Sequence, residues 1–423
     1  MSRKALLLSV VLLMVVTILL AACRSTPEPQ VIEKMVTKVV EVVVTAVPET
    51  GVLSEVSAEQ RAWLEAAQVG PFAPAEEDWD AVYQAATDEG KVVVYSDSSR
   101  IFKIIESFEE AYPGVTVEAF DITTPDLILK LKAEQNAGIN NADVIFVGDA
   151  STVVPELVRP HLVWNYVPPD LIPVIPEERR YPILVHHYGM KVLAYNSEVN
   201  DEAPVDNWWD LTREEWKGKV LFKDPFKSGD WFNLFSMMIK NADLMAKAYE
   251  KEFGKPIELD EDAPTAGHQW IKDLVANEPV LTGSDGDASE AVGTLGQDDP
   301  PIGVFAYSKY RHVLSGKQAF AAALEAEPMS GVCLATTLGM ANNAPHPNAA
   351  KLMIKYYMGD EKGGLGYTPY YTPGNLSPRT DMPPPEGMFG MDVAQDTLWF
   401  VDPDWAYLNL VDIRDYWTIQ LED

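Results

Sequence analysis

The segment Lys91–Phe108, KVVVYSDSSRIFKIIESF, joins a strand pattern to a helix pattern through five polar residues. Its first part is rich in β-branched and aromatic side chains, which favours a buried strand over Lys91–Tyr95. Beyond the polar loop the apolar residues recur at helical spacing, at Ile101, Ile104, Ile105 and Phe108. We therefore expect a helix over Arg100–Tyr112, with Ser96–Arg100 as the connecting loop.

The same alternation continues along the chain. A second strand is predicted over Val115–Phe120, a helix over Pro125–Asn136 and a third strand over Asp143–Val147. Continuous apolar strands separated by helices indicate a parallel sheet covered on both faces, and ligands bind beyond the carboxyl ends of such strands. This reasoning places Ser96–Arg100 and Gly148–Ser151 at one shared edge of the sheet.

The second half of the chain repeats the arrangement. The strand Gly218–Lys223 is followed by the polar residues Lys227–Trp231 and a helix over Phe232–Lys240. The remaining predicted elements are the strands Met190–Tyr195, Pro301–Tyr307 and Val332–Thr336 and the helices Ser57–Ala67, Glu76–Glu89 and Asn348–Met358. A polar loop that opens a helix thus occurs twice.

The N-terminus has the pattern of an export signal. Arg3 and Lys4 precede an apolar run that ends in Leu20-Ala21-Ala22-Cys23. This ending resembles a bacterial lipobox, in which Cys23 becomes the lipidated first residue. We therefore expect a signal peptide over residues 1–22, followed over residues 23–75 by a Val-rich tether, which includes Val31–Val47, and a short helix.

Composition narrows the class of protein. The 423 residues carry 64 Asp and Glu against 33 Lys and Arg, a formal charge of −31, which argues against nucleic acid as a partner. With Cys23 lipidated, Cys333 has no partner for an internal disulfide. Stability must then come from a hydrophobic core, and the chain is long enough for two lobes.

Motifs of common enzymes and cofactor sites are absent from the sequence. It contains no P-loop, Gly-x-Gly-x-x-Gly, Gly-x-Ser-x-Gly or His-Glu-x-x-His segment. His186 and His187 are adjacent, and neighbours on a strand point to opposite faces, which argues against a zinc site. We expect no cofactor and no enzymatic activity.

The loop Ser96-Asp97-Ser98-Ser99-Arg100 has three interpretations. Its serines can cap the following helix. Its hydroxyls, backbone N–H groups and Arg100 can instead cradle a polar ligand at a helix N-terminus. A nucleophilic serine is the third interpretation, but it needs a positioned base that the nearby sequence does not supply.

Two aromatic segments are further candidates for a binding site. Tyr307 and Tyr310 lie three residues apart after a strand, so their phenols can bind ferric iron, stack on an organic ligand or simply pack. The loop from Tyr370 through Tyr371 to Asn375 is either exposed or lines a pocket.

Several segments together resemble one family. They are GKVVVYSDSSRIFKIIESFEEAYPGVTVEAF, KLKAEQNAGINNADVIFVGD, GMKVLAYNSE, NWWDLTREEWKGKVLFKDP, PPIGVFAYSKYRHVLSGK and APHPNAAKLMIKYYMGDE. In this order and spacing they are similar to the extracellular solute-binding lipoproteins of bacterial ABC importers. The likeness is greatest to the ferric-iron-binding-like branch of the type II periplasmic-binding-protein fold, over about Gly90–Arg379.

The resemblance implies an α/β fold of two lobes, each a mainly parallel sheet flanked by helices, joined by hinge strands. It places residues 87–189 and 334–365 in the first lobe and residues 190–333 and 366–423 in the second. The cleft between the lobes would close on a solute. The residues that would line it are Ser96, Asp97, Ser98, Ser99, Arg100, Asp149, Ser228, Trp231, Ser284, Tyr307, Tyr310, Tyr371 and Asn375.

The family label favours ferric iron or an iron chelate as the solute, with Tyr307 and Tyr310 as ligands. Ferric-binding relatives typically have two adjacent tyrosines, whereas here Ser308 and Lys309 separate the pair. The hydroxyl-rich loop resembles instead that of relatives that bind phosphonates, phosphate esters or other organic anions. Both solutes are expected alternatives.

The resemblance also implies the partners and the place of the protein. An ABC permease and its ATPase would receive the solute, and the protein would sit outside the cytoplasm, periplasmic or on the cell surface. Only the lipid on Cys23 would hold it to the membrane. A sensory lipoprotein and a secreted hydrolase remain the alternatives of another class.

Overall fold

The valine-rich segment forms strand β1 (Lys91–Ser96), which pairs in parallel with β2 (Thr116–Asp121) and with β3 (Val144–Val147). The structure is a computed structural model, and it describes residues 56–422. The predicted signal peptide, Cys23 and the Val-rich tether lie outside the described residues. The parallel arrangement predicted for the first three strands is confirmed.

The strands form one mixed sheet in the order β2-β1-β3-β10-β5-β8-β6-β7. Its other members are β4 (Val163–Trp164), β5 (Leu184–Asn196), β6 (Val220–Lys223), β7 (Val280–Thr282), β8 (Ile302–Ala306), β9 (Phe320–Ala322), β10 (Gly331–Ala341), β11 (Asn375–Leu376) and β12 (Leu398–Phe400). At the far end β6 lies in parallel between β7 and β8. We call the half with β1–β3 lobe 1 and the half with β6–β8 lobe 2.

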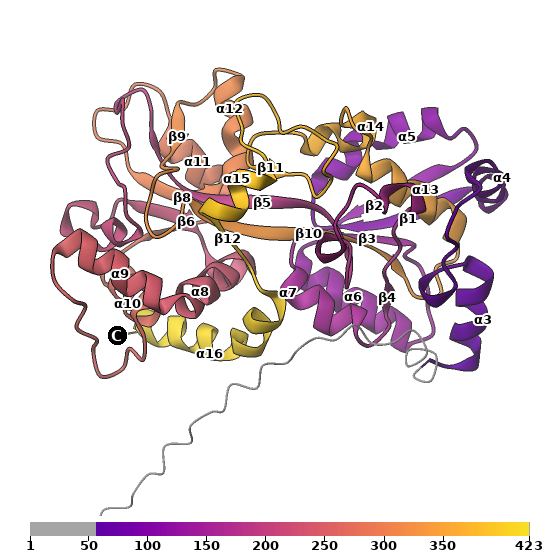
Figure 1. Ribbon diagram of the computed structural model, residues 1–423, viewed down its shortest axis with the longest axis horizontal. Helices are drawn as coiled ribbons and strands as arrows, with labels where there is room; N and C mark the ends of the chain where they lie inside the picture. The colour runs from indigo at the N-terminus through magenta and orange to yellow at the C-terminus, as the bar shows by residue number, and fades with distance from the viewer. Residues whose placement is uncertain (1–55, 423) are drawn as a thin grey trace, which may run out of the picture. The chain divides into compact units, whose positions relative to one another are not determined.

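Two long strands join the lobes. β10 pairs antiparallel with β3 in lobe 1, β5 pairs antiparallel with β8 in lobe 2, and β5 and β10 pair with each other between them. Both strands are longer than the segments Met190–Tyr195 and Val332–Thr336 that the sequence predicted. The described chain therefore has the expected two-lobed fold with hinge strands, which Figure 1 shows.

Helices cover both faces of each half of the sheet (Figure 1). The α-helices are α3 (Ala58–Ala67), α4 (Trp79–Glu89), α5 (Ile105–Ala111), α6 (Thr124–Asn136), α7 (Ala150–Val153), α8 (Asp230–Lys240), α9 (Ala242–Phe253), α10 (Ala266–Ala276), α11 (Asp285–Gly293), α12 (Arg311–Leu314), α13 (Pro347–Met358), α14 (Gly364–Tyr367), α15 (Met391–Thr397) and α16 (Pro403–Glu422). The predicted helix from Arg100 instead begins as a 3₁₀ helix, η2 (Ser99–Lys103), before α5.

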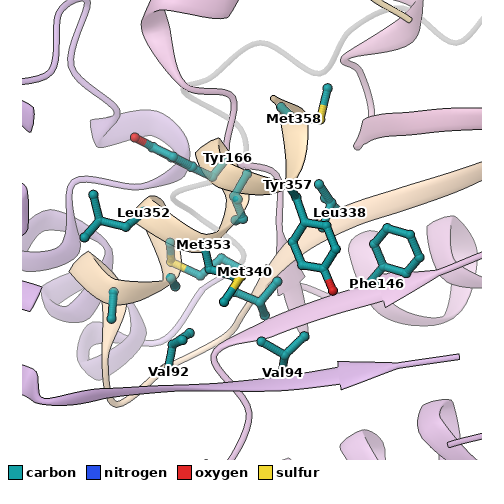
Figure 2. Close-up of a cluster of buried hydrophobic side chains, with 14 of the residues drawn as sticks. Val92, Val94, Phe146, Tyr166, Leu338, Met340, Leu352, Met353, Tyr357 and Met358 are labelled. Carbon is teal, nitrogen blue, oxygen red and sulfur yellow. The ribbon is translucent and has the colours of Figure 1, made fainter. Parts of the chain in front are cut away.

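Alternate residues of the central strands feed different cores, as a pleated sheet requires. Val92 and Val94 of β1 face α13, whereas Val93 and Tyr95 pack with α6 on the opposite face. Figure 2 shows the first of these clusters, where Leu352, Met353 and Tyr357 of α13 cover the sheet. Lobe 2 likewise has one core on each face of the sheet, which fixes the strand ends that bear the polar loops.

The C-terminal segment contains the largest element that the sequence analysis did not assign. α16 packs Ile413 and Trp417 into the core of lobe 2, and its Tyr407 hydroxyl donates to Glu156 of lobe 1 at 2.6 Å. Tyr370 belongs to the lobe 1 core beside α13. The exact residues at which the chain changes lobe stay a prediction. None of the described helices has the length and apolar character needed to cross a bilayer.

Candidate functional site

A cavity of about 280 Å³ lies between the two lobes, at the carboxyl ends of the parallel strands. Both lobes and both hinge strands contribute to its lining. Its residues are Asp97, Thr123, Thr124, Pro125, Gly148, Gly189, Met190, Lys191, Lys223, Lys227, Ser228, Asp230, Ala306, Leu334 and Thr336. The edge predicted from the strand order is therefore where the cavity forms.

Asp97 provides the charge on the lobe 1 wall. It follows β1 directly, and its Oδ2 atom accepts hydrogen bonds from the Gly148 N–H at 2.7 Å and the Thr124 hydroxyl at 2.8 Å. Burial, together with the charges of Asp230 and Asp149, raises the pKa of Asp97 to about 6. α6 begins at Thr124 beside it, so a helix N-terminus also faces the cavity.

The lobe 2 wall carries lysines and a second helix N-terminus. β6 ends at Lys223, the 3₁₀ helix η8 (Pro225–Lys227) turns the chain, and α8 begins at Asp230. Lys223, Lys227 and Ser228 all line the cavity. Orphan N–H groups at the start of α8 and the lysine ammonium groups contribute positive potential to this wall, which the carboxylate of Asp230 partly offsets.

Lys191 of β5 forms the charged floor between the walls. Its side chain is 2% exposed, and its Nζ lies 3.1 Å from Asp285 and 3.4 Å from Asp230. Burial opposes the charge of Asp230, but Lys191 and Lys223 hold the pKa of that carboxyl below its ordinary value. The three side chains thus form an ion triad with one buried cation and two partly exposed anions.

The cavity collects positive charge in a strongly acidic protein. Lys191 is neutralised by its triad, but within the part of the chain that the structure describes Lys223 and Lys227 form no ion pair. Arg100 and Lys309, which lie elsewhere in the cleft region, form none either, and burial lowers the pKa of Arg100 to about 10 and that of Lys309 to about 8. Lys227 is exposed and the other three are only partly buried, so water can solvate them. A ligand that displaced this water would have to balance their charge.

Comparison with known proteins agrees with this geometry. Residues 103–388 match the family model described as bacterial extracellular solute-binding protein. The chain belongs to this family. The expected family is confirmed, and the solute-binding protein therefore acts outside the cytoplasm. Its family and fold are those of binding proteins and not of enzymes. No curated protein matches the chain.

Solved structures with the same fold are similar at low sequence identity. Iron-bound HitA from Pseudomonas aeruginosa matches with a TM-score of 0.60 and 15% identity, over 78% of this chain and 99% of its own. The substrate-binding protein of the ABC transporter from Agrobacterium tumefaciens matches with a TM-score of 0.60 and 17% identity, over 80% and 96%. The apo ferric ion-binding protein A from Pasteurella haemolytica matches with a TM-score of 0.54 and 20% identity, over 79% and 96%.

The serines of the first loop act mainly as caps. Ser96 Oγ accepts from the Ser98 N–H and donates to the Ser98 carbonyl, both at 3.0 Å, and Ser98 Oγ accepts from the Arg100 N–H at 3.5 Å. Ser99 begins η2. Of the five loop residues only Asp97 lines the cavity, whereas the Arg100 guanidinium reaches the Ser308 hydroxyl of lobe 2 at 3.4 Å.

Two further predicted residues hold elements in place near the cleft. Asp149 accepts from Asn233 of α8 at 3.1 Å, which makes a direct contact between the lobes. Ser284 caps α11 by accepting from the Asp287 N–H at 3.1 Å. Neither residue lines the cavity, so their effect on a solute is indirect.

The predicted role of Trp231 in lining the cleft is wrong. Trp231 is the second residue of α8 and turns inward to stack on Phe222, with ring centroids 3.9 Å apart and no exposed surface. The turn of α8 explains this, because it directs the side chain of Trp231 into the core. Only the residues at the very start of the helix and just before it stay at the end of the strand, beside the cavity. The lining from this loop is instead Lys227, Ser228 and Asp230.

The four remaining aromatic and amide candidates also pack elsewhere. The rings of Tyr307 and Tyr310 pack together in a lobe 2 core, with their centroids 5.2 Å apart. Burial raises the pKa of Tyr307 to about 12. The Tyr371 hydroxyl donates to the Pro383 carbonyl at 3.0 Å, and Asn375 donates to the Tyr370 carbonyl at 2.9 Å. Tyr371 and Asn375 line a separate hollow of about 40 Å³.

The expectation that His186 and His187 point apart is also wrong. Their Nδ1 atoms lie 2.8 Å apart because the pairing of β5 with β10 shifts register at this point, which turns both rings to one side. Burial lowers the pKa of His186 to about 3. Both rings are therefore neutral packing elements, and His186 bonds to the Tyr357 carbonyl at 3.0 Å.

Sequence reasoning missed Lys191, Lys223 and Thr124 as lining residues. Lys223 was detectable, because it ends a predicted strand at the same edge as Ser96. Lys191 gave a weaker signal as a single charge inside the apolar strand Met190–Tyr195, a position where a charge needs a buried partner.

Proposed function

We propose that this solute-binding protein is the receptor of an ABC importer and that its solute is a small organic anion, such as a phosphonate or a phosphate ester. The receptor role is supported by the family and by the name of the Agrobacterium neighbour, a substrate-binding protein of an ABC transporter. The class of solute is argued from the cavity itself.

The surplus of unpaired cations carries the proposal. Lys223 and Lys227 lie beside the N-terminus of α8 without a carboxylate within 4 Å among the described residues. Oxyanions suit such a place, because ammonium groups and free backbone N–H groups together solvate negative charge. An anion between the lobes would also neutralise the walls and so favour the closed cleft.

Ferric iron fits this site less well, although two of the three similar structures described above are named as iron-bound or ferric ion-binding proteins. The predicted ligands Tyr307 and Tyr310 are not among the cavity-lining residues, and the phenol of Tyr307 resists ionisation. Lys309 and Arg311 lie beside them and would repel a trivalent cation. In the described chain one carboxylate group has metal-like spacing, at Asp206, Asp210 and Glu252, and Arg213 already pairs with two of its members.

Solute capture would proceed by movement of the lobes about β5 and β10. The structure already contains two contacts that close the cleft, Asn233 to Asp149 and Arg100 to Ser308. Both are side-chain hydrogen bonds that can break when the lobes part, since they add little to either core. The lipid on Cys23 would hold the receptor near its permease, and the mass of the N-terminal peptide from membrane fractions tests this placement.

A thermal-shift and calorimetry panel tests the proposal on the full chain. Phosphonates and phosphate esters should raise Tm, because a ligand that binds only the folded state stabilises it. Lys223→Ala/Lys227→Ala should weaken binding by about 100-fold, since each charged hydrogen bond contributes roughly 1.5–3 kcal/mol. The control Lys217→Ala/Lys251→Ala removes two exposed lysines of the same lobe and should leave the affinity unchanged.

Ferric salts provide the opposing arm of the same panel. If ferric iron raises Tm and gives a phenolate-to-iron colour band while no organic anion shifts Tm, the anion proposal is wrong. The colour band should then disappear in Tyr307→Phe/Tyr310→Phe, which would restore the tyrosine pair as the site.

A further inference from the structure

The lobe 1 wall presents one charged group to the cavity, and that group is negative. Asp97 is the only ionisable lining residue that lobe 1 contributes, whereas lobe 2 contributes Lys223, Lys227 and Asp230. Asp230 is already compensated by Lys191 at 3.4 Å. Within residues 56–422 no cation pairs with Asp97.

One oxygen of Asp97 is left for a ligand. Both protein donors, the Gly148 N–H and the Thr124 hydroxyl, bond to Oδ2, and no described group bonds to Oδ1. Asp97 is partly exposed, so water can reach its free oxygen, but a carboxylate that a bound ligand shields from water needs its charge balanced and its oxygens bonded. Here Asp149 and Asp230 add negative charge around it, which supports the need for a positive partner.

The uncompensated charges on the two walls of the cavity therefore have opposite sign, negative on lobe 1 and positive on lobe 2. An anion alone would satisfy Lys223 and Lys227 but would approach the Asp97 carboxylate unfavourably. A cation alone would satisfy Asp97 but would meet the lysines and the N-termini of α6 and α8. A molecule with both charges satisfies both walls, and a cavity of about 280 Å³ suits a compact one.

We propose that the solute is a small zwitterion, whose anionic group faces Lys223, Lys227 and the start of α8 and whose ammonium group faces Asp97. This inference rests on the proposed function, because it assumes that the lysine wall binds an anion. Asp97 then determines specificity by rejecting anions that lack a donor, since they bring a second negative charge close to it and displace the water at its Oδ1 without replacing the hydrogen bond.

Matched ligands that exchange one ammonium group for a methyl group test the inference. The pairs are 2-aminoethylphosphonate with propylphosphonate and β-alanine with butyrate, measured by calorimetry on the full chain. In at least one pair the ammonium compound should bind roughly tenfold more tightly or better, as expected for a charge-assisted hydrogen bond. Equal binding within each pair overturns the zwitterion but leaves the anion receptor intact, whereas failure of both members of both pairs to bind overturns both proposals.

The variant Asp97→Asn tests whether this side chain causes the preference for the ammonium compound over its methyl counterpart. An amide oxygen can still accept from Gly148 and Thr124, but the negative charge is gone, so the preference within the pair should disappear. Asp121→Asn is the matched control, because Asp121 is an exposed acid at the end of the neighbouring strand β2 and does not line the cavity. A preference that survives Asp97→Asn overturns the assignment.

A titration of the wild-type protein gives the same information without a substitution. The preference for β-alanine over butyrate should fall as pH decreases from about 7.5 to about 5, because Asp97 takes up a proton in this range. The groups that face Asp97 are Asp149, Asp230, Tyr357, Tyr370, the Thr124 hydroxyl and the Gly148 N–H. The two carboxylates make its protonation easier, and burial raises the pKa of both phenols, so they stay neutral in this range. A preference that stays constant over this range contradicts the inference.

Discussion

The two polar loops that follow β1 and β6 have the same pattern in sequence and different uses in the structure. In both, a buried strand ends in hydroxyl and charged residues that lead into a helix. After β1, Ser96 and Ser98 bond to the loop backbone, so little of their polarity is free. After β6, Lys227 and Ser228 line the cavity wall, where the Ser228 hydroxyl interacts with Asp230 and Lys227 has no ion pair among the described residues.

This difference teaches how to tell a capping loop from a binding loop. A polar group that has an internal partner holds the chain in place, whereas one that lacks a partner needs water or a ligand. By this criterion lobe 1 contributes a rigid frame with a single functional carboxylate, Asp97. Under the proposed function, lobe 2 contributes the groups that would hold an anion.

Lys191 should show the largest effect, because it pairs with Asp230 at the end of the loop after β6 and with Asp285. Lys191→Met leaves Asp230 and Asp285 without their buried partner, although both carboxylates are partly exposed, and unfolding in urea should show a loss of about 3 kcal/mol. Lys217→Met, at an exposed ion pair, should change stability by less than about 0.5 kcal/mol. Adding Asp285→Asn to Lys191→Met should recover part of the loss, and no recovery would contradict the ion triad as its cause.

Asp97 should show the next largest effect, and in the opposite direction. Its folded-state pKa of about 6 lies above the ordinary value of 3.8, so its negative charge opposes folding above pH 6. Each pKa unit corresponds to about 1.4 kcal/mol, so Asp97→Asn should stabilise the ligand-free protein by about 1–3 kcal/mol at neutral pH.

The pH dependence of that gain identifies its origin. As pH falls through 6 towards 4 the wild-type carboxyl takes up its proton, so the advantage of Asp97→Asn should shrink and vanish. Urea unfolding at several pH values measures this. A gain that is constant with pH would show that hydrogen bonding and not charge is responsible.

The order of strands and helices was predictable because it depends on local periodicity. The valines of β1 and the alternation with helices up to β3 predicted the parallel sheet and the edge where Asp97 lies. The full length of β5 and β10 was not predictable. Polar residues such as His186 and Tyr188 interrupt the apolar pattern of β5, and its pairing partner in β10 is distant in sequence.

The candidate site was less predictable than the fold, for a reason of geometry. Sequence places a residue at a strand end but does not state which way its side chain turns. Trp231 and Ser228 belong to one loop, yet α8 turns the first into the core and leaves the second at the cavity. Tyr307 and Tyr310 likewise pack inward, because aromatic rings gain more from burial than from exposure at an edge.

A pair of serine substitutions should give the smallest effects and the sharpest contrast between the loops. Ser98→Ala removes a cap with a long hydrogen bond of 3.5 Å, so it should cost about 0.5–1 kcal/mol of stability and leave solute affinity unchanged. Ser228→Ala removes a contact with the partly exposed Asp230, so it should change stability by less than about 0.5 kcal/mol. It should cause a several-fold loss of affinity for the anion that the panel identifies, since its side chain lines the cavity. Urea unfolding and calorimetry on both variants measure the two quantities. If Ser98→Ala weakens binding as much as Ser228→Ala does, the first loop is also a binding loop, and the distinction drawn from internal hydrogen bonds is wrong.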